Sequence, residues 1–206
     1  MHFDQAAATW DEDPGRRQRA LALAGELRPI IRRYQVRNAL DYGAGTGTVS
    51  FLLADELGHI LLIDLSEGMA RQARQKIAER GLANMEVRQL DLLTTPVEGQ
   101  FDLVYTLMTL HHIRDTRGIL ERFYALLRPG GCCCIADLEA EDGSFHAAFP
   151  DFDGHNGFEP EALGRQMETV GFSGVEYHRF YTISREASGD ERREYPLFFL
   201  KGEKKH

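Results

Sequence analysis

The chain has 206 residues, of which 43% are hydrophobic, and it contains no internal repeat, so one compact domain is expected and a disordered chain or a solenoid is excluded. A formal net charge of −8, from 24 basic and 32 acidic residues, disfavours nucleic acid as a partner. The apolar runs are too short to span a bilayer and the first residues do not resemble a signal peptide, so we expect a cytoplasmic protein with no membrane association.

The first half of the chain predicts helices that alternate with buried strands. Apolar residues recur three and four positions apart across residues 16–34, which predicts a helix that Pro29 bends or divides. The continuous apolar run at 59–65 is typical of a strand buried on both faces. Ser66 is a suitable N-cap for a helix that ends at Gly81. A further strand is expected at 38–42 and a helix at 48–57.

The second half continues the alternation and completes a mostly parallel sheet. Three strands are expected at 85–92, 101–107 and 132–138, a helix at 116–128 that Pro129-Gly-Gly131 ends, a helix at 159–170, and closing strands near 175–183 and 195–201. Cys132, Cys133 and Cys134 alternate between the two faces of a strand, so they form neither a disulfide framework nor a joint metal site. In such a sheet, ligands bind at the carboxyl ends of the strands.

The strongest functional signal is an acidic residue followed by glycines at every second position. Asp41 ends the first strand, and Gly43, Gly45 and Gly47 allow the backbone to approach a bound molecule. A dinucleotide loop usually has the pattern Gly-x-Gly-x-x-Gly without this acid and binds a pyrophosphate. S-adenosylmethionine carries no phosphate but has an ammonium group, which Asp41 could hold directly or through water.

Two more carboxylates follow the next two predicted strands. Asp64 could accept hydrogen bonds from both ribose hydroxyls of an adenosine, and Asp91 could accept one from the adenine amino group. Leu65, Met69 and Leu92 could form apolar walls against the base. Alone, a glycine turn is often only a tight connection and an aspartate after a strand is often a helix cap. Their joint placement after three successive strands predicts a site for a nucleoside cofactor.

With these motifs the sequence resembles class I S-adenosylmethionine-dependent methyltransferases. The matching segments cover most of the predicted sheet and are Leu40-Asp-Tyr-Gly-Ala-Gly-Thr-Gly47, Leu62-Ile-Asp-Leu-Ser-Glu-Gly-Met69, Gln89-Leu-Asp91, Phe101-Asp-Leu-Val104, Leu110-His-His-Ile113 and Leu127-Arg-Pro-Gly-Gly131. The resemblance implies an α/β fold with a doubly wound, Rossmann-like, seven-stranded and mostly parallel sheet whose last strand is antiparallel.

The resemblance also implies which part of the cofactor each residue contacts. Asp41 and the glycines would face the methionine part, Asp64 the ribose and Asp91 the adenine. The full set of expected cofactor-binding residues is Asp41, Gly43, Ala44, Gly45, Gly47, Asp64, Leu65, Met69, Asp91, Leu92 and Thr106.

We expect one domain over residues 1–206 with three functional segments. Residues 1–36 form a helical segment in which Phe3 and Trp10 either cover the cofactor as a lid or pack against the sheet edge. Residues 37–138 form the cofactor-binding core, and residues 139–206 contribute to the acceptor side.

Histidines supply the candidates for acceptor chemistry. His111 and His112 follow the fourth strand and are predicted catalytic residues that could take a proton from a hydroxyl or thiol, although a capping or packing role is the alternative for each. Trp10, His146 and His155 are assigned to the acceptor side. No metal site is predicted, because the spacing of His146 and His155 with Asp151 and Asp153 matches no known ligand pattern.

These observations predict in-line transfer of a methyl group from S-adenosylmethionine to a small-molecule acceptor, with S-adenosylhomocysteine as the product. Tyr105-Thr-Leu-Met108 lacks the Asn/Asp-Pro-Pro-aromatic motif that accompanies methylation of bases or glutamine, and Asp137-Leu-Glu139 is a poor match to the acidic pair of metal-dependent catechol enzymes. The identity of the acceptor, the methylated atom and the oligomeric state stay open.

Two other functions are considered. A non-catalytic module that only binds the cofactor needs the same residues, because the transfer requires no signature base. An NAD(P)-dependent oxidoreductase would share the sheet and Asp64, but it leaves Asp41 and Asp91 without a role.

Overall fold

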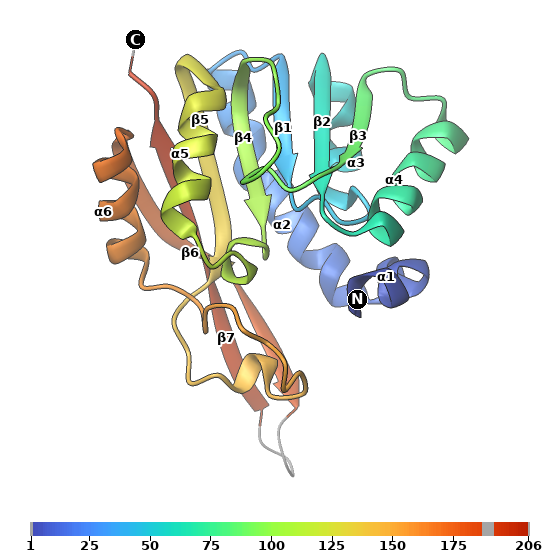
Figure 1. The fold of residues 1–206 in the computed structure, drawn as a ribbon, viewed down its shortest axis with the longest axis vertical. Helices are drawn as coiled ribbons and strands as arrows, with labels where there is room; N and C mark the ends of the chain where they lie inside the picture. The colour runs from blue at the N-terminus through green and yellow to red at the C-terminus, as the bar shows by residue number, and fades with distance from the viewer. Residues whose placement is uncertain (1, 187–191, 206) are drawn as a thin grey trace.

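The computed structural model describes residues 2–186 and 192–205, and their strands form one mixed sheet (Figure 1). The strands are β1 (Asn38–Tyr42), β2 (His59–Asp64), β3 (Met85–Gln89), β4 (Phe101–Leu107), β5 (Leu127–Leu138), β6 (Ser173–Glu186) and β7 (Arg192–Glu203). The helices are α1 (His2–Ala6), α2 (Pro14–Arg33), α3 (Thr48–Leu53), α4 (Glu67–Arg80), α5 (Thr116–Leu126) and α6 (Pro160–Val170). Short 3₁₀ turns are η1 (Ala7–Glu12), η2 (Ala54–Glu56), η3 (Leu110–His112) and η4 (Ser144–His146).

The sheet has the order β3-β2-β1-β4-β5-β7-β6 across the described residues. The strands β1 to β5 pair in parallel, whereas β7 is antiparallel to both β5 and β6. The predicted fold class is therefore confirmed, including the antiparallel last strand. The chain moves outward from β1 to β3 and then returns to β4 on the other side of β1, so the loops after β1 and β4 diverge at a topological switch point.

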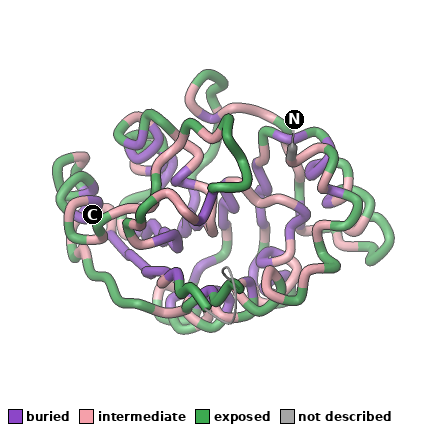
Figure 2. The backbone as a smooth tube through the Cα atoms, turned by 90° about the horizontal axis from the view of Figure 1, so that it is seen from below, coloured by how far each residue is buried: buried purple, intermediate pink, exposed green. Residues whose placement is uncertain are grey.

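Helices cover both faces of the sheet and enclose two hydrophobic cores. One core joins α2, α3 and α4 to the sheet, and the other joins α5 and α6 to the opposite face. Cys132 and Cys134 lie in the first core and Cys133 lies in the second, as the alternation of a strand requires. Figure 2 shows the buried segments running through the centre of the molecule and the exposed segments around the outside.

Local signals predicted several boundaries correctly. Strand β1 has the predicted limits. The side chain of Ser66 accepts a hydrogen bond from the backbone N–H of Met69 and so caps α4, which ends at Gly81 with a positive φ of 63°. Both ends of this helix follow from residues within the helix itself or next to it.

Several boundaries differ from the prediction. The helix expected to end at Pro129-Gly-Gly131 ends at Leu126, because β5 already begins at Leu127, which pairs with Phe101. The next pair is Leu103 with Cys132, so the proline and glycines lie in an irregular part of β5.

Pro29 does not divide α2, which runs through it without interruption. The buried neighbours Leu27, Ile30 and Ile31 hold this part of the helix against the core. Strand β3 ends at Gln89 and not at Leu92, because the chain turns at Asp91, whose backbone oxygen accepts a hydrogen bond from Thr95.

The strands β6 and β7 are longer than predicted and form a hairpin that extends beyond the rest of the sheet (Figure 1). The far part of this hairpin packs with the segment after β5 in a third cluster, which contains Leu138, Phe145 and Tyr195. The bridge between Glu139 and Phe158 closes that segment into a loop. The hairpin thereby supports the long loop of residues 139–158.

The buried carboxylate of Asp102 fixes the start of β1. One of its oxygens accepts hydrogen bonds from the backbone N–H groups of Arg37 (2.7 Å) and Asn38 (2.8 Å), and the other pairs with Arg128. We expect Asp102→Ala to lower the free energy of unfolding by about 2–4 kcal/mol, because two backbone N–H groups and Arg128 lose a buried acceptor. Urea denaturation measures this change. Glu121→Gln, in an exposed helical pair with Arg117, is the control and is expected to change it by less than about 0.5 kcal/mol. Equal effects of the two substitutions would contradict this role of Asp102.

Candidate functional site

The glycine-rich loop after β1 is attached to the end of β2. The backbone N–H groups of Gly43 and Ala44 donate to the carbonyl oxygen of Ile63 at 2.8 and 3.0 Å. One carboxylate oxygen of Asp64 accepts a hydrogen bond from Gly45 N at 2.7 Å. Gly43 has a φ of 67°, and a Cβ atom there would lie 2.2 Å from the Thr109 side chain, so glycine is required at this position.

Asp41 is almost completely buried beneath this loop. Its carboxylate accepts a hydrogen bond from the Ser50 hydroxyl at 2.6 Å, and that hydroxyl is 2.7 Å from the Tyr105 hydroxyl. Burial raises the pKa of Asp41 to about 7, although the hydrogen bonds from Ser50 and Tyr105 oppose the shift and the nearby Asp64 adds to it. A cationic ligand group would stabilise the charged form of this carboxylate.

Asp64 and Asp91 have roles in their own loops. The second oxygen of Asp64 accepts a hydrogen bond from Ser66 N at 2.8 Å, and burial raises the pKa of Asp64 even though these backbone donors oppose the shift. Asp91 accepts a hydrogen bond from Leu93 N at 2.9 Å. A carboxylate oxygen can accept more than one hydrogen bond, so these contacts leave acceptor capacity for a ligand. Asp41 and Asp64 lie at the carboxyl ends of β1 and β2 and Asp91 follows β3, so the three carboxylates share one edge of the sheet.

The other predicted cofactor-binding residues differ in exposure. Leu65 is 57% exposed, whereas Met69 and Leu92 are buried. Thr106 is fully buried near the end of β4, and its hydroxyl has no hydrogen-bond partner among the described residues.

The N-terminal segment lies across the glycine loop and the start of α4. Asp4 accepts hydrogen bonds from Ser66 Oγ at 2.7 Å and from Gly68 N at 2.9 Å. Asp11 accepts hydrogen bonds from the hydroxyls of Thr46 and Thr48 and pairs with Lys76. The indole of Trp10 is next to Gly45, where a Cβ atom would lie 3.7 Å from its nitrogen.

The predicted catalytic residues His111 and His112 lie in η3, directly after β4. His111 is buried, and its Nδ1 is 2.5 Å from Asp137 Oδ1, while its backbone N–H donates to the other oxygen of Asp137 at 3.2 Å. Burial opposes the charge of Asp137, but the His111 imidazole and the hydrogen bonds hold the pKa of Asp137 below its usual value. Asp137 was not among the predicted site residues, although it contacts His111. The sequence signal that could have identified it is a charged residue within a buried central strand, because such a group requires a partner.

His146 comes from η4, yet it lies beside the two histidines of η3. Its ring is 5.0 Å from that of His111 and 5.7 Å from that of His112, and it stacks on Phe152 at 3.7 Å with an interplanar angle of 6°. Burial, together with the nearby His111 and Arg185, lowers the pKa of His146 to about 4, so its imidazole is neutral at neutral pH.

His155 holds the long loop in place but lies apart from this cluster. Its backbone N–H donates to the carbonyl oxygen of His111 at 2.7 Å. Its ring nitrogen Nε2 faces Thr116 Oγ1 at 3.2 Å and the carbonyl oxygen of Ile113 at 3.0 Å. The backbone contact brings the loop of residues 139–158 against η3, and this is how His146 reaches its position.

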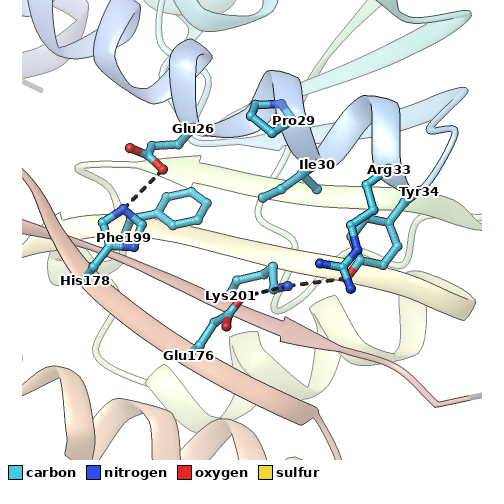
Figure 3. Close-up of a pocket in the computed structure, with 9 residues that line it drawn as sticks. All are labelled: Glu26, Pro29, Ile30, Arg33, Tyr34, Glu176, His178, Phe199 and Lys201. Atoms are coloured by element: carbon cyan, nitrogen blue, oxygen red, sulfur yellow. Dashed lines mark hydrogen bonds and ion pairs between the residues drawn. The ribbon is translucent and has the colours of Figure 1, made fainter.

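A surface pocket on the α2 side of the sheet is separate from these loops (Figure 3). Lys201 forms an ion pair there with Glu176 at 2.9 Å and donates to the hydroxyl of Tyr34 at 3.3 Å. Lys201 is opposite Cys134, in the middle of β5, whereas the candidate site is at the strand ends. No helix within residues 2–186 and 192–205 has the length and apolar character needed to cross a membrane.

Comparisons with known proteins agree with this arrangement. A family model described as a methyltransferase domain matches residues 39–131. The chain is 31% identical over 144 residues to phosphoethanolamine N-methyltransferase 1 of Zea mays, a match that covers 68% of this chain and 28% of that protein. It is also 31% identical over 115 residues to a demethylmenaquinone methyltransferase of Listeria monocytogenes, which covers 53% of this chain and 48% of the relative. The matches thus span less than half the length of these relatives.

Solved structures share the fold at low sequence identity. The DhpI–SAH complex superposes with a TM-score of 0.74 at 18% identity and covers 99% of this chain and 94% of that chain. Phosphoethanolamine N-methyltransferase 2 of Haemonchus contortus, in complex with phosphomonomethylethanolamine and S-adenosylhomocysteine, superposes with a TM-score of 0.69 at 18% identity and covers 82% of this chain and 49% of that chain. The motifs, the sheet order and the sequence matches together show that the chain belongs to the class I S-adenosylmethionine-dependent methyltransferases.

Proposed function

We propose that this protein binds S-adenosylmethionine and transfers its methyl group to a small-molecule acceptor. The observation that carries the proposal is the row of carboxylates Asp41, Asp64 and Asp91, which lie at the carboxyl ends of β1, β2 and β3 beside the glycine loop. Membership of the family and the small-molecule substrates in the names of the two curated relatives support the same function.

Each carboxylate suits one part of the cofactor. The ammonium group of the methionine part would stabilise the charged form of the buried Asp41. Asp64 would accept hydrogen bonds from the ribose hydroxyls, and Asp91 would accept one from the adenine amino group. The exposed side chain of Leu65 would cover one face of the base. Gly43, Gly45 and Gly47 would let the backbone approach the sulfonium part.

The acceptor would approach from the side of η3 and η4. Methyl transfer from a sulfonium is an in-line displacement, so positioning of the acceptor atom supplies much of the rate. His111 would act as the proton acceptor for a hydroxyl or thiol, because Asp137 binds its Nδ1 and directs Nε2 elsewhere. A general base of this kind contributes about 10²–10⁴-fold.

The N-terminal segment of residues 1–36 would act as a lid over the bound cofactor. Asp4 and Asp11 hold this segment against α4 and the glycine loop, and Trp10 is beside Gly45. The segments at 37–138 and 139–206 would supply the cofactor side and the acceptor side.

Calorimetric titration with S-adenosylmethionine, S-adenosylhomocysteine and NADH tests the proposed cofactor. We expect both adenosyl compounds to bind, NADH not to bind, and Asp64→Ala to weaken binding at least about tenfold, since charge-assisted hydrogen bonds are lost. Because Asp64 also holds the glycine loop, substitution of the exposed Leu65 in Leu65→Ser gives a second variant. Asp55→Ala, at an exposed residue of η2, is the control. Binding of NADH alone would favour an oxidoreductase. Turnover of the bound cofactor with acceptors in a cell extract separates an enzyme from a binding module.

The proposed contact with Asp41 predicts proton release on binding. Below its pKa of about 7 the buried carboxyl is protonated, and a bound ammonium group lowers that pKa. The affinity for S-adenosylhomocysteine is therefore expected to increase as the pH rises from about 6 to about 8 through this pKa, with protons released near neutral pH. Calorimetry in two buffers of different ionisation enthalpy measures the release.

Asp41→Asn is expected to remove most of this pH dependence, whereas Asp55→Asn is expected to keep it. An unchanged dependence in Asp41→Asn would place the titrating group elsewhere and contradict the proposed contact.

A further inference from the structure

We propose that His111, His112 and His146 together form a binding site for one divalent transition-metal ion. Each residue offers one ring nitrogen, and these nitrogens lie within 4.8 Å of one another. Three imidazoles suit Zn²⁺, Fe²⁺, Co²⁺ or Ni²⁺, whereas Mg²⁺ and Ca²⁺ prefer oxygen ligands. Three protein ligands also leave a coordination position for water or another molecule.

Asp137 gives this cluster the outer contact that is typical of metal-binding histidines. Its carboxylate is 2.5 Å from His111 Nδ1, so His111 presents Nε2 to the cluster. Metal-ligating histidines almost always donate their other ring N–H to a carboxylate, a carbonyl or water, which fixes the tautomer and orients the ring. Asp137 and His111 are both at most 2% exposed at their side chains, so solvent does not replace this contact.

His146 provides a second, independent observation. Its Nδ1 is buried and has no hydrogen-bond partner among the residues that the structure describes. Buried polar atoms in folded proteins are nearly always satisfied, so an orphaned ring nitrogen next to two other imidazoles indicates a missing partner. Phe152 stacks on the ring of His146 and holds it in this orientation.

The backbone around the cluster also restricts its shape. A Cβ atom at Gly154 would lie 2.2 Å from the carbonyl oxygen of His111, so only glycine allows the long loop to come this close to η3. Phe3 contacts the ring of His112 edge-on at 5.2 Å between centroids. The three imidazoles thus come from two loops that packing holds together.

This inference departs from the expectation that no metal site is present. That expectation considered Asp151, Asp153 and His155 as partners of His146, and the structure places His155 against α5 and pairs Asp153 with Arg114. The histidines that do meet His146 are His111 and His112, which are distant from it in the sequence. An ion bound there would occupy Nε2 of His111, the proposed proton acceptor, so His111 would act as a base only in the metal-free protein. This consequence rests on the proposed function, whereas the binding of the metal does not.

Titration of the full-length, tag-free and chelator-treated protein with Co²⁺ tests the site. We expect one Co²⁺ per chain, with the visible absorption of a cobalt ion bound by nitrogen ligands. His112→Gln and His146→Gln are each expected to weaken binding at least about tenfold. Asp137→Asn, which removes no ligand, is expected to weaken it about 10–100-fold.

Two histidines serve as matched controls. His59→Gln and His178→Gln change surface histidines that pair with Glu86 and Glu26, so both variants are expected to bind Co²⁺ as the wild-type protein does. Circular dichroism checks that each variant is folded. Unchanged Co²⁺ affinity in His112→Gln and His146→Gln, or no binding to the wild-type protein, would overturn the inference.

A parallel titration with S-adenosylhomocysteine separates this inference from the proposed function. If the wild-type protein binds Co²⁺ but not S-adenosylhomocysteine, the metal site stands and the cofactor proposal is wrong. If it binds S-adenosylhomocysteine but not Co²⁺, the metal site is wrong and the cofactor proposal stands.

Discussion

The hydrogen bond from Gly45 N to the Asp64 carboxylate joins the ends of two neighbouring strands, and the geometry of the candidate site depends on it. With the two bonds from Gly43 and Ala44 to Ile63, it fixes the glycine loop over the end of β2. Thr109, in the loop after β4, contacts Gly43 at the switch point of the sheet. Because parallel strands end at a common edge, one loop can contact its neighbours on both sides.

The buried carboxylates give this edge a definite preference for a cation. Burial raises the pKa values of both Asp41 and Asp64, because it disfavours the charged carboxylate. Repulsion by Asp64 adds to the shift at Asp41. The free-energy cost of these buried negative charges decreases when a positively charged group binds next to them. A pyrophosphate would add further negative charge next to Asp41, which is why the acidic residue before the glycines distinguishes an ammonium-bearing cofactor from a dinucleotide. Binding of a cationic ligand is therefore expected to increase the stability of the folded protein.

The sequence predicted those features that depend on neighbouring residues. The limits of β1, the cap at Ser66 and the glycine loop are encoded within a few positions, and they are confirmed. The predicted start of β5 was wrong, because the pairing of Leu127 with Phe101 outweighs the effect of the helix-ending residues that follow Leu127. The meeting of His146 with His111 depends on contacts between residues distant in the chain, and local patterns do not report such contacts. Asp137 was missed for the same reason.

The switch point divides the site into two halves of different chemistry. The carboxyl ends of β1, β2 and β3 carry carboxylates, whereas η3 and η4, which follow β4 and β5, carry imidazoles. The N-terminal segment contacts both halves, since Trp10 is beside Gly45 and Phe3 packs against His112. Movement of this segment would therefore open or cover both halves together. If the segment acts as the proposed lid, access of the cofactor would depend on the same aromatic residues that contact the glycine loop and the histidines.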